Sequence, residues 1–134
     1  MTTSTVTYIG ALQTTCMHTN SGYQITTDAP TDNHGKGAYF SPTDLCATAL
    51  ATCAITTMGI KANLENKFLG DVKAEVYKVM ANNPRRISEI RIDFIFSDAY
   101  TEAQKEWLMA IAHNCPVAKS LHPDIKQVFS FAWA

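Results

Sequence analysis

The segment Phe40–Ile60, FSPTDLCATALATCAITTMGI, most constrains how this chain can fold. Ser41 can cap a helix whose first residue is a proline, and Asp44 completes an S-x-x-D capping box. No glycine or further proline interrupts the pattern until Gly59, so the sequence predicts a helix over Pro42–Met58. Small or apolar residues occur nearly all round this helix, which is typical of a helix buried on several sides.

Two of the cysteines fall in predicted helices. Cys53 lies in the middle of the apolar helix with no local charge to activate it, a place where cysteine is usually a small core residue. Cys115 precedes Pro116 and takes the N-cap of a short helix, where backbone N–H groups and the helix dipole favour a thiolate. Lys119 and His113 can add to this effect, although Cys115 can also simply end a loop. The residues alone thus make Cys115 the more acidic thiol and the two cysteines a candidate disulfide pair.

The composition is that of one soluble globular domain. The chain has 134 residues, 46% of them hydrophobic and 17% charged, enough for one core and too few for two ordinary domains. A net charge of −1 without a basic run gives no reason to expect nucleic acid or an anionic membrane as a partner. The first residues lack the pattern of a secretory signal, and Asp44 and Lys61 bound the most apolar window, so we expect no membrane span. We therefore expect a cytoplasmic protein whose cysteines are free thiols, metal ligands or a transient redox pair.

The remaining segments predict strands on both sides of the central helix. The resulting order, β-β-β-α-β-β-α-α-β, predicts an α+β fold. A loop at Thr27–Phe40, rich in Asp, Asn, Gly and Pro, is long enough to suggest a binding or partner-contacting role. The other expected elements are strands at Val6–Leu12, Gln13–His18, Tyr23–Thr27, Gly70–Met80, Ile87–Phe96 and Val128–Trp133, and helices at Ala103–His113 and from Cys115 to about Leu121.

A metal site is an alternative use for the cysteines. Cys16 and His18 form a C-x-H pair, and His113 and Cys115 form an H-x-C pair. Structural zinc sites usually carry their cysteines at C-x₂₋₄-C spacing, which neither pair has. We therefore expect no metal and no other cofactor.

Four segments, in order over nearly the whole chain, resemble the OsmC/Ohr family, the osmotically inducible and organic hydroperoxide resistance proteins: DAPTDNHGKG, FSPTDLCATALATC, PRRI and NCPVAKSL. A P-x-[DE]-L…A-x-C helix with C-P-V about sixty residues later is a fairly specific combination. The resemblance implies a single domain over residues 1–134 with an OsmC-like fold. In that fold, curved antiparallel sheets surround buried central helices that carry the cysteines, and two chains intertwine as a homodimer.

The resemblance also implies thiol peroxidase chemistry in oxidative stress defence. Cys53 would be the peroxidatic thiolate that attacks the O–O bond of an organic hydroperoxide to give a sulfenic acid and an alcohol. Cys115 would resolve the sulfenic acid as a disulfide, which an external dithiol reduces. The family thus assigns the reactive thiol to Cys53, whereas the local sequence favours Cys115.

The sequence departs from the organic hydroperoxide resistance branch at two positions. In that branch an N-terminal arginine, reaching the site across the dimer, and a glutamate support the thiolate. Here no arginine precedes Arg85, and the glutamate position, ten residues before Cys53, is Thr43. Asp44 matches the acidic residue of the general OsmC-like branch, but its capping role explains it, and its spacing from Cys53 puts the two on opposite faces of an ideal helix. The candidate activating cations are then His18, Lys36 and His34.

A protein without efficient turnover is the alternative function. Without the arginine, the same fold suits a non-catalytic small-molecule binder or a redox sensor. Such a protein would oxidise once and fail to cycle.

Overall fold

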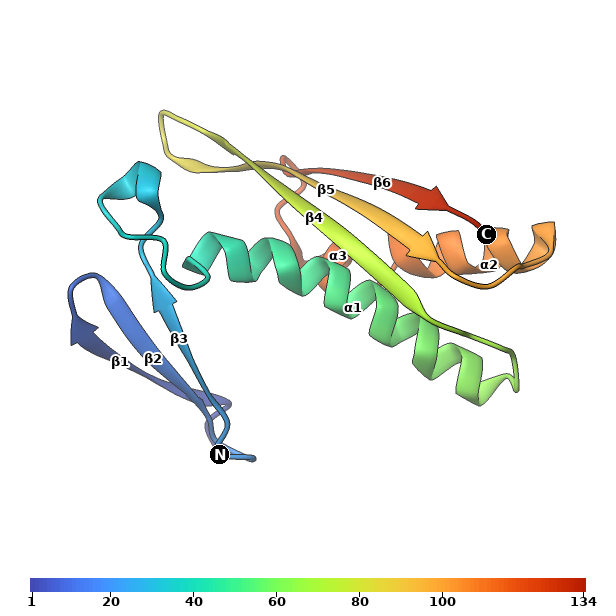
Figure 1. The fold of residues 1–134 in the computed structure, drawn as a ribbon, viewed down its shortest axis with the longest axis horizontal. Coiled ribbons are helices and arrows are strands. Elements are labelled where there is room, and N and C mark those ends of the chain that lie inside the picture. Colours follow the sequence, from blue (N-terminus) through green and yellow to red (C-terminus); the bar gives the residue numbers. More distant parts are fainter. The chain divides into compact units, whose positions relative to one another are not determined.

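The computed structural model describes all 134 residues and has the predicted element order, with a short 3₁₀ turn, η1 (Thr31–Asn33), added before the central helix (Figure 1). The strands form two separate three-stranded sheets. The chain divides into two compact units, Met1–Cys46 and Ala47–Ala134, and helix α1 (Pro42–Leu64) continues through the boundary without a break. The predicted α+β fold class is confirmed. The prediction that residues 1–134 form a single domain is not tested by this division into units and stays a prediction.

The first unit contains an antiparallel sheet in the order β1-β2-β3. Its strands are β1 (Ser4–Gly10), β2 (Gln13–His18) and β3 (Gln24–Asp28). The expected first strand ran to Leu12, but Ala11 and Leu12 have φ of 53° and 64° and form the reversal into β2. Neither residue type is typical of a turn at positive φ, so the only local signal for this reversal is Gly10, which precedes them and has a φ of 89°.

Helix α1 begins with the capping box that the sequence predicts. The Ser41 N–H donates to Asp44 Oδ2 at 3.0 Å, and the Asp44 N–H donates to Ser41 Oγ at 3.0 Å. The predicted end at Met58 is wrong, because the helix continues through Gly59 to Leu64. Met58 and Ala62, one turn apart, are both buried, so a packed stripe extends beyond the glycine and outweighs its low helix propensity.

The length and composition of α1 also correct the expectation that no window is long enough to span a membrane. Its 23 residues have a mean hydropathy of 1.4 over the most apolar window and pass that criterion. The core helix of a soluble protein passes the same criterion, and α1 contributes six buried residues to the protein interior: Ala47, Leu50, Ala51, Ala54, Met58 and Ala62.

The second unit contains the sheet β4-β5-β6. Strands β4 (Val72–Ala81) and β5 (Arg86–Phe96) form the expected antiparallel hairpin, with the polar face of β4 in solvent. Strand β6 (Lys126–Ala132) differs from the expected antiparallel arrangement, because it lies parallel to β5. Parallel neighbours need a long crossover, and the two helices between β5 and β6 supply it.

The two crossover helices complete the core of this unit. Helix α2 (Glu102–His113) has the predicted capping box, with the Gln104 N–H donating to Thr101 Oγ1 at 3.2 Å and the Thr101 N–H to Gln104 Oε1 at 2.8 Å. Helix α3 (Pro116–Ser120) follows directly. Buried residues of α1, β5 and α2 form one cluster: Leu50, Ala54 and Met58 with Ile90, Ile92 and Phe94 and with Leu108 and Ile111.

We predict that Gly59→Ala raises the free energy of unfolding by about 0.5–1 kcal/mol, because alanine favours a helix interior. A Cβ built at Gly59 would meet only Leu69 Cδ2, at 4.0 Å, an ordinary contact. Urea unfolding followed by circular dichroism measures the change. Gly22→Ala is the matched control and should destabilise by about 1–2 kcal/mol, since Gly22 has a φ of 73°. A loss of stability in Gly59→Ala would contradict this account of α1.

Candidate active site

The structure brings together the two cysteines that the sequence singles out. Cys53 lies in the middle of α1, and Cys115 is the N-cap of α3. Their thiols interact directly, and the backbone N–H of Val117, in the first turn of α3, donates to Cys53 Sγ at 3.4 Å. The core of the second unit thus contains a pair of neighbouring free thiols.

The two thiols differ in their access to solvent. Cys53 lies at the margin of the core and is half-buried, whereas Cys115 belongs to the core and is 0% exposed. Cys53 is therefore the more accessible of the two thiols. Cys115 can react only with a group that is already inside the protein, and Cys53 is its neighbour there.

Burial raises the pKa of the Cys115 thiol above its ordinary value, because the thiolate would lose its hydration. The Cys53 side chain raises this pKa further, while the backbone N–H groups of Ala118 and Val117 lower it without reversing the effect. The expectation that the N-cap position makes Cys115 an acidic thiol is therefore wrong. Desolvation outweighs the helix terminus, and a local sequence pattern does not reveal burial.

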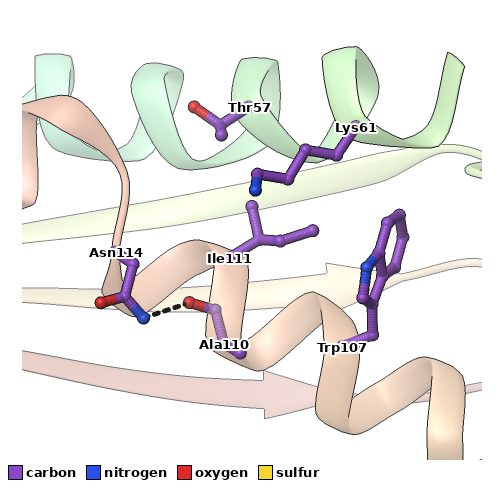
Figure 2. Close-up of a pocket in the computed structure, with 6 residues that line it drawn as sticks. All are labelled: Thr57, Lys61, Trp107, Ala110, Ile111 and Asn114. Carbon is purple, nitrogen blue, oxygen red and sulfur yellow. Dashed lines mark hydrogen bonds between the residues drawn. The ribbon is translucent and has the colours of Figure 1, made fainter. Parts of the chain in front are cut away.

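Thr57 and a pocket beyond it border the thiol pair. Thr57 lies one turn after Cys53, donates its hydroxyl to the Cys53 carbonyl oxygen at 2.7 Å and places Oγ1 4.0 Å from Cys53 Sγ. A pocket of about 260 Å³ opens beside Thr57 between α1 and α2 (Figure 2). Its lining residues are Thr57, Lys61, Trp107, Ala110, Ile111 and Asn114. The sequence analysis missed this pocket. The four-residue spacing of Cys53, Thr57 and Lys61, which puts them on one helix face, could have indicated it.

The predicted supporting residues all belong to the Met1–Cys46 unit. His18 is an exposed residue of β2, and its Nδ1 is 2.7 Å from Ser21 Oγ. Lys36 is exposed in the loop before α1. Asp44 forms the capping box of α1, as its sequence context indicates. Support of Cys53 by any of these groups, or by His34, remains a prediction.

The same unit contains a second pocket, of about 400 Å³, on its sheet. Cys16 and His18 lie in its lining together with Ser4, Val6, Tyr23, Ile25 and Leu45. No group of three His, Cys, Asp or Glu side chains in the structure is arranged to hold a metal ion. The C-x-H pair therefore lacks the third protein ligand that both structural and catalytic zinc sites use.

We predict that the free energy of unfolding of the reduced protein falls above about pH 8.5 and that ionisation of Cys115 causes part of this fall. Because the pKa of Cys115 is higher in the folded than in the unfolded chain, the unfolded chain releases this proton first. The stabilisation is complete below the unfolded pKa and is lost as the pH rises through the folded pKa, by about 1.4 kcal/mol per unit between the two. Urea unfolding from pH 7 to 10, with a phosphine reductant, measures it. Cys115→Ala should show a shallower fall, and identical pH profiles would contradict the raised pKa.

Comparison with known proteins gives the family. A family model described as OsmC-like protein matches residues 34–128. A search of the curated proteins gives no match. Among solved structures, a Psychrobacter arcticus protein assigned provisionally to osmotic stress and detoxification responses is 49% identical. Its alignment covers 98% of this chain and 96% of that chain, with a TM-score of 0.93.

Two more distant structures share the fold. An organic hydroperoxide resistance protein OsmC from Legionella pneumophila is 18% identical, with coverage of 98% of each chain and a TM-score of 0.77. The organic hydroperoxide resistance protein OhrB of Bacillus subtilis is 17% identical, with coverage of 97% of this chain and 98% of that chain and a TM-score of 0.70. The family model and the 49% identical relative carry the assignment. The chain belongs to the OsmC-like protein family.

Proposed function

We propose that this protein is a thiol-dependent peroxidase that reduces organic hydroperoxides, with Cys53 as the nucleophile and Cys115 as the resolving thiol. The observation that carries the proposal is the contrast between a half-buried Cys53 and a fully buried Cys115 in direct interaction. The names of the Legionella and Bacillus structures refer to organic hydroperoxide resistance, which agrees with this chemistry. A cytoplasmic location, where thiols are kept reduced, also fits it.

The donor geometry supports Cys53 as the nucleophile. The Val117 N–H points at Cys53 Sγ, and a hydrogen bond to sulfur stabilises negative charge that the reacting thiolate carries. Cys115 is buried and has a raised pKa, so it stays protonated and does not compete for the peroxide. The two roles are thereby separated by burial.

The proposed reaction has three balanced steps. The Cys53 thiolate attacks one peroxide oxygen, so an S–O bond forms while the O–O bond breaks, and the departing alkoxide takes a proton to become the alcohol. Cys115 sulfur then attacks the Cys53 sulfenic acid, so the disulfide forms while its oxygen leaves as water with the Cys115 proton. An external dithiol finally reduces the disulfide by two thiol–disulfide exchanges and becomes oxidised itself.

We predict that one equivalent of cumene hydroperoxide converts the fully reduced protein to a Cys53–Cys115 disulfide. Disulfide mapping by mass spectrometry identifies the bond. Cys53→Ser should form no such disulfide, and Cys115→Ser should hold a Cys53 sulfenic acid that dimedone traps. Cys46→Ser, a second thiol of α1, is the matched control and should form the disulfide normally.

Two outcomes would contradict the peroxidase. Unchanged thiols would remove the proposal and leave a small-molecule binder on the same fold. A disulfide that forms once but is not re-reduced by any dithiol tested would favour a redox sensor.

We also propose that the protein acts as a homodimer, as the resemblance to the OsmC/Ohr proteins implies. Large apolar side chains remain exposed on α1 and just after it, with 53% of Ile60, 78% of Leu64 and 57% of Phe68 in solvent. Exposed apolar patches commonly mark contact with another protein surface. A second copy of the chain is the partner that the family suggests.

We predict a single species of twice the chain mass in light scattering coupled to size-exclusion chromatography. Leu64→Glu places a charge on the exposed apolar surface and should shift the equilibrium towards monomer. Thr52→Glu, also on an exposed position of α1, is a charge control that lies outside this apolar group. A monomer at micromolar concentration would contradict the proposal of a dimer.

A further inference from the structure

Lys61, in the pocket between α1 and α2, is a cation without an acidic partner. Its side chain is exposed and forms no ion pair in the structure. Glu65, one turn later, would be its natural helical partner but binds Lys67 at 3.2 Å instead. The pocket therefore holds an uncompensated positive charge.

The Lys61 pocket is lined by Thr57, Lys61, Trp107, Ala110, Ile111 and Asn114. Opposite Lys61, the apolar residues Trp107, Ala110 and Ile111 form most of the wall, and Asn114 is its polar member. Figure 2 shows the Lys61 side chain reaching across towards Ile111, with the Trp107 ring at the end of the pocket away from Asn114. Lys67 Nζ, which is paired with Glu65, lies 4.4 Å from the centroid of the Trp107 ring. The Asn114 amide is held by its bond to the Ala110 carbonyl at 2.7 Å. A cation facing an aromatic and aliphatic wall suits a molecule with an anionic group and an apolar body.

The pocket lies next to the thiol pair along two elements. On α1, Thr57 follows Cys53 by one turn and Lys61 follows Thr57 by another, so the three residues share a face and span about 12 Å. In Figure 2 the Lys61 ammonium lies on the Thr57 side of its own backbone, and Thr57 in turn lies one helical turn after Cys53. After α2, Asn114 directly precedes Cys115. Thr57, which lines the pocket and has its Oγ1 4.0 Å from Cys53 Sγ, therefore connects the Lys61 pocket with the thiol pair.

We propose that the Lys61 pocket binds the carboxylate of a small organic anion and thereby makes the thiol pair selective for hydroperoxides that carry a carboxylate. The selectivity part rests on the proposed peroxidase function, whereas the anion site does not. The volume of about 260 Å³ lies below the range for drug-sized ligands, so one substituted ring or a short branched chain fits it. Lys61 is the residue that determines specificity, and Trp107 and Ile111 contact the hydrocarbon.

Binding to a protein that cannot turn over tests the site itself. In Cys53→Ser, calorimetry should show that 4-isopropylbenzoate binds about tenfold or more tightly than 4-isopropylbenzamide, which has the same shape without the charge. Lys61→Met should remove this difference and Lys61→Arg should restore it. Lys73→Met, an exposed lysine on the polar face of β4, is the matched control for net charge and should leave it unchanged. Equal affinity for the two compounds, or an equal loss of both in Lys61→Met, would overturn the anion site.

Turnover in the wild-type protein tests selectivity. With a dithiol reductant in excess, kcat/KM for cumene hydroperoxide carrying a 4-carboxylate should exceed that for cumene hydroperoxide about tenfold, through a lower KM. Lys61→Met should bring the ratio of the two values close to one, and Lys73→Met should not change it. A ratio of one in the wild-type protein would overturn the selectivity. Preferential benzoate binding without turnover of either peroxide would instead refute the peroxidase and retain the anion site.

Discussion

Burial of the α1 stripe in the core of the second unit is the constraint on which the candidate site depends. Leu50, Ala54 and Met58 pack in one cluster with the centre of β5 and the apolar face of α2, and Cys115 belongs to the same cluster. Cys53 immediately precedes Ala54, so it falls at the edge of the buried stripe and remains partly exposed. The packing of a helix thus decides which thiol meets solvent.

The same packing changes the chemistry of the second thiol. Position alone, at the N-cap of α3, would favour a Cys115 thiolate, and two backbone N–H groups do act in that direction. Removal of water from the sulfur acts in the opposite direction and has the larger effect. Helix α3 has only five residues, so its dipole is small, and its Val117 N–H is directed to Cys53.

The features that the sequence predicts correctly are those determined by residues close together in the sequence. Both capping boxes, the β4–β5 hairpin and the N-cap position of Cys115 depend on residues a few places apart, and all were predicted correctly. The end of α1 was predicted incorrectly, because residues distant in the sequence bury Met58 and Ala62 and so stabilise the helix beyond Gly59. The direction of β6 and the pKa of Cys115 depend on tertiary packing in the same way. For the candidate site, the sequence identified the two cysteines. Their interaction and the Lys61 pocket could be recognised only from the three-dimensional structure.

A buried resolving thiol has a consequence for the proposed peroxidase cycle. Oxidation beyond the sulfenic acid requires a second peroxide to reach the same sulfur before the disulfide forms. Because Cys115 already interacts with Cys53, resolution needs no diffusion of a second protein to the site. The raised pKa makes Cys115 a weaker nucleophile at neutral pH, so closeness must compensate for a small thiolate fraction. Burial therefore lowers the intrinsic reactivity of Cys115 and also protects it from peroxide. A thiol pair that passes through many oxidation cycles needs this protection, because a resolving thiol that peroxide has oxidised can no longer form the disulfide.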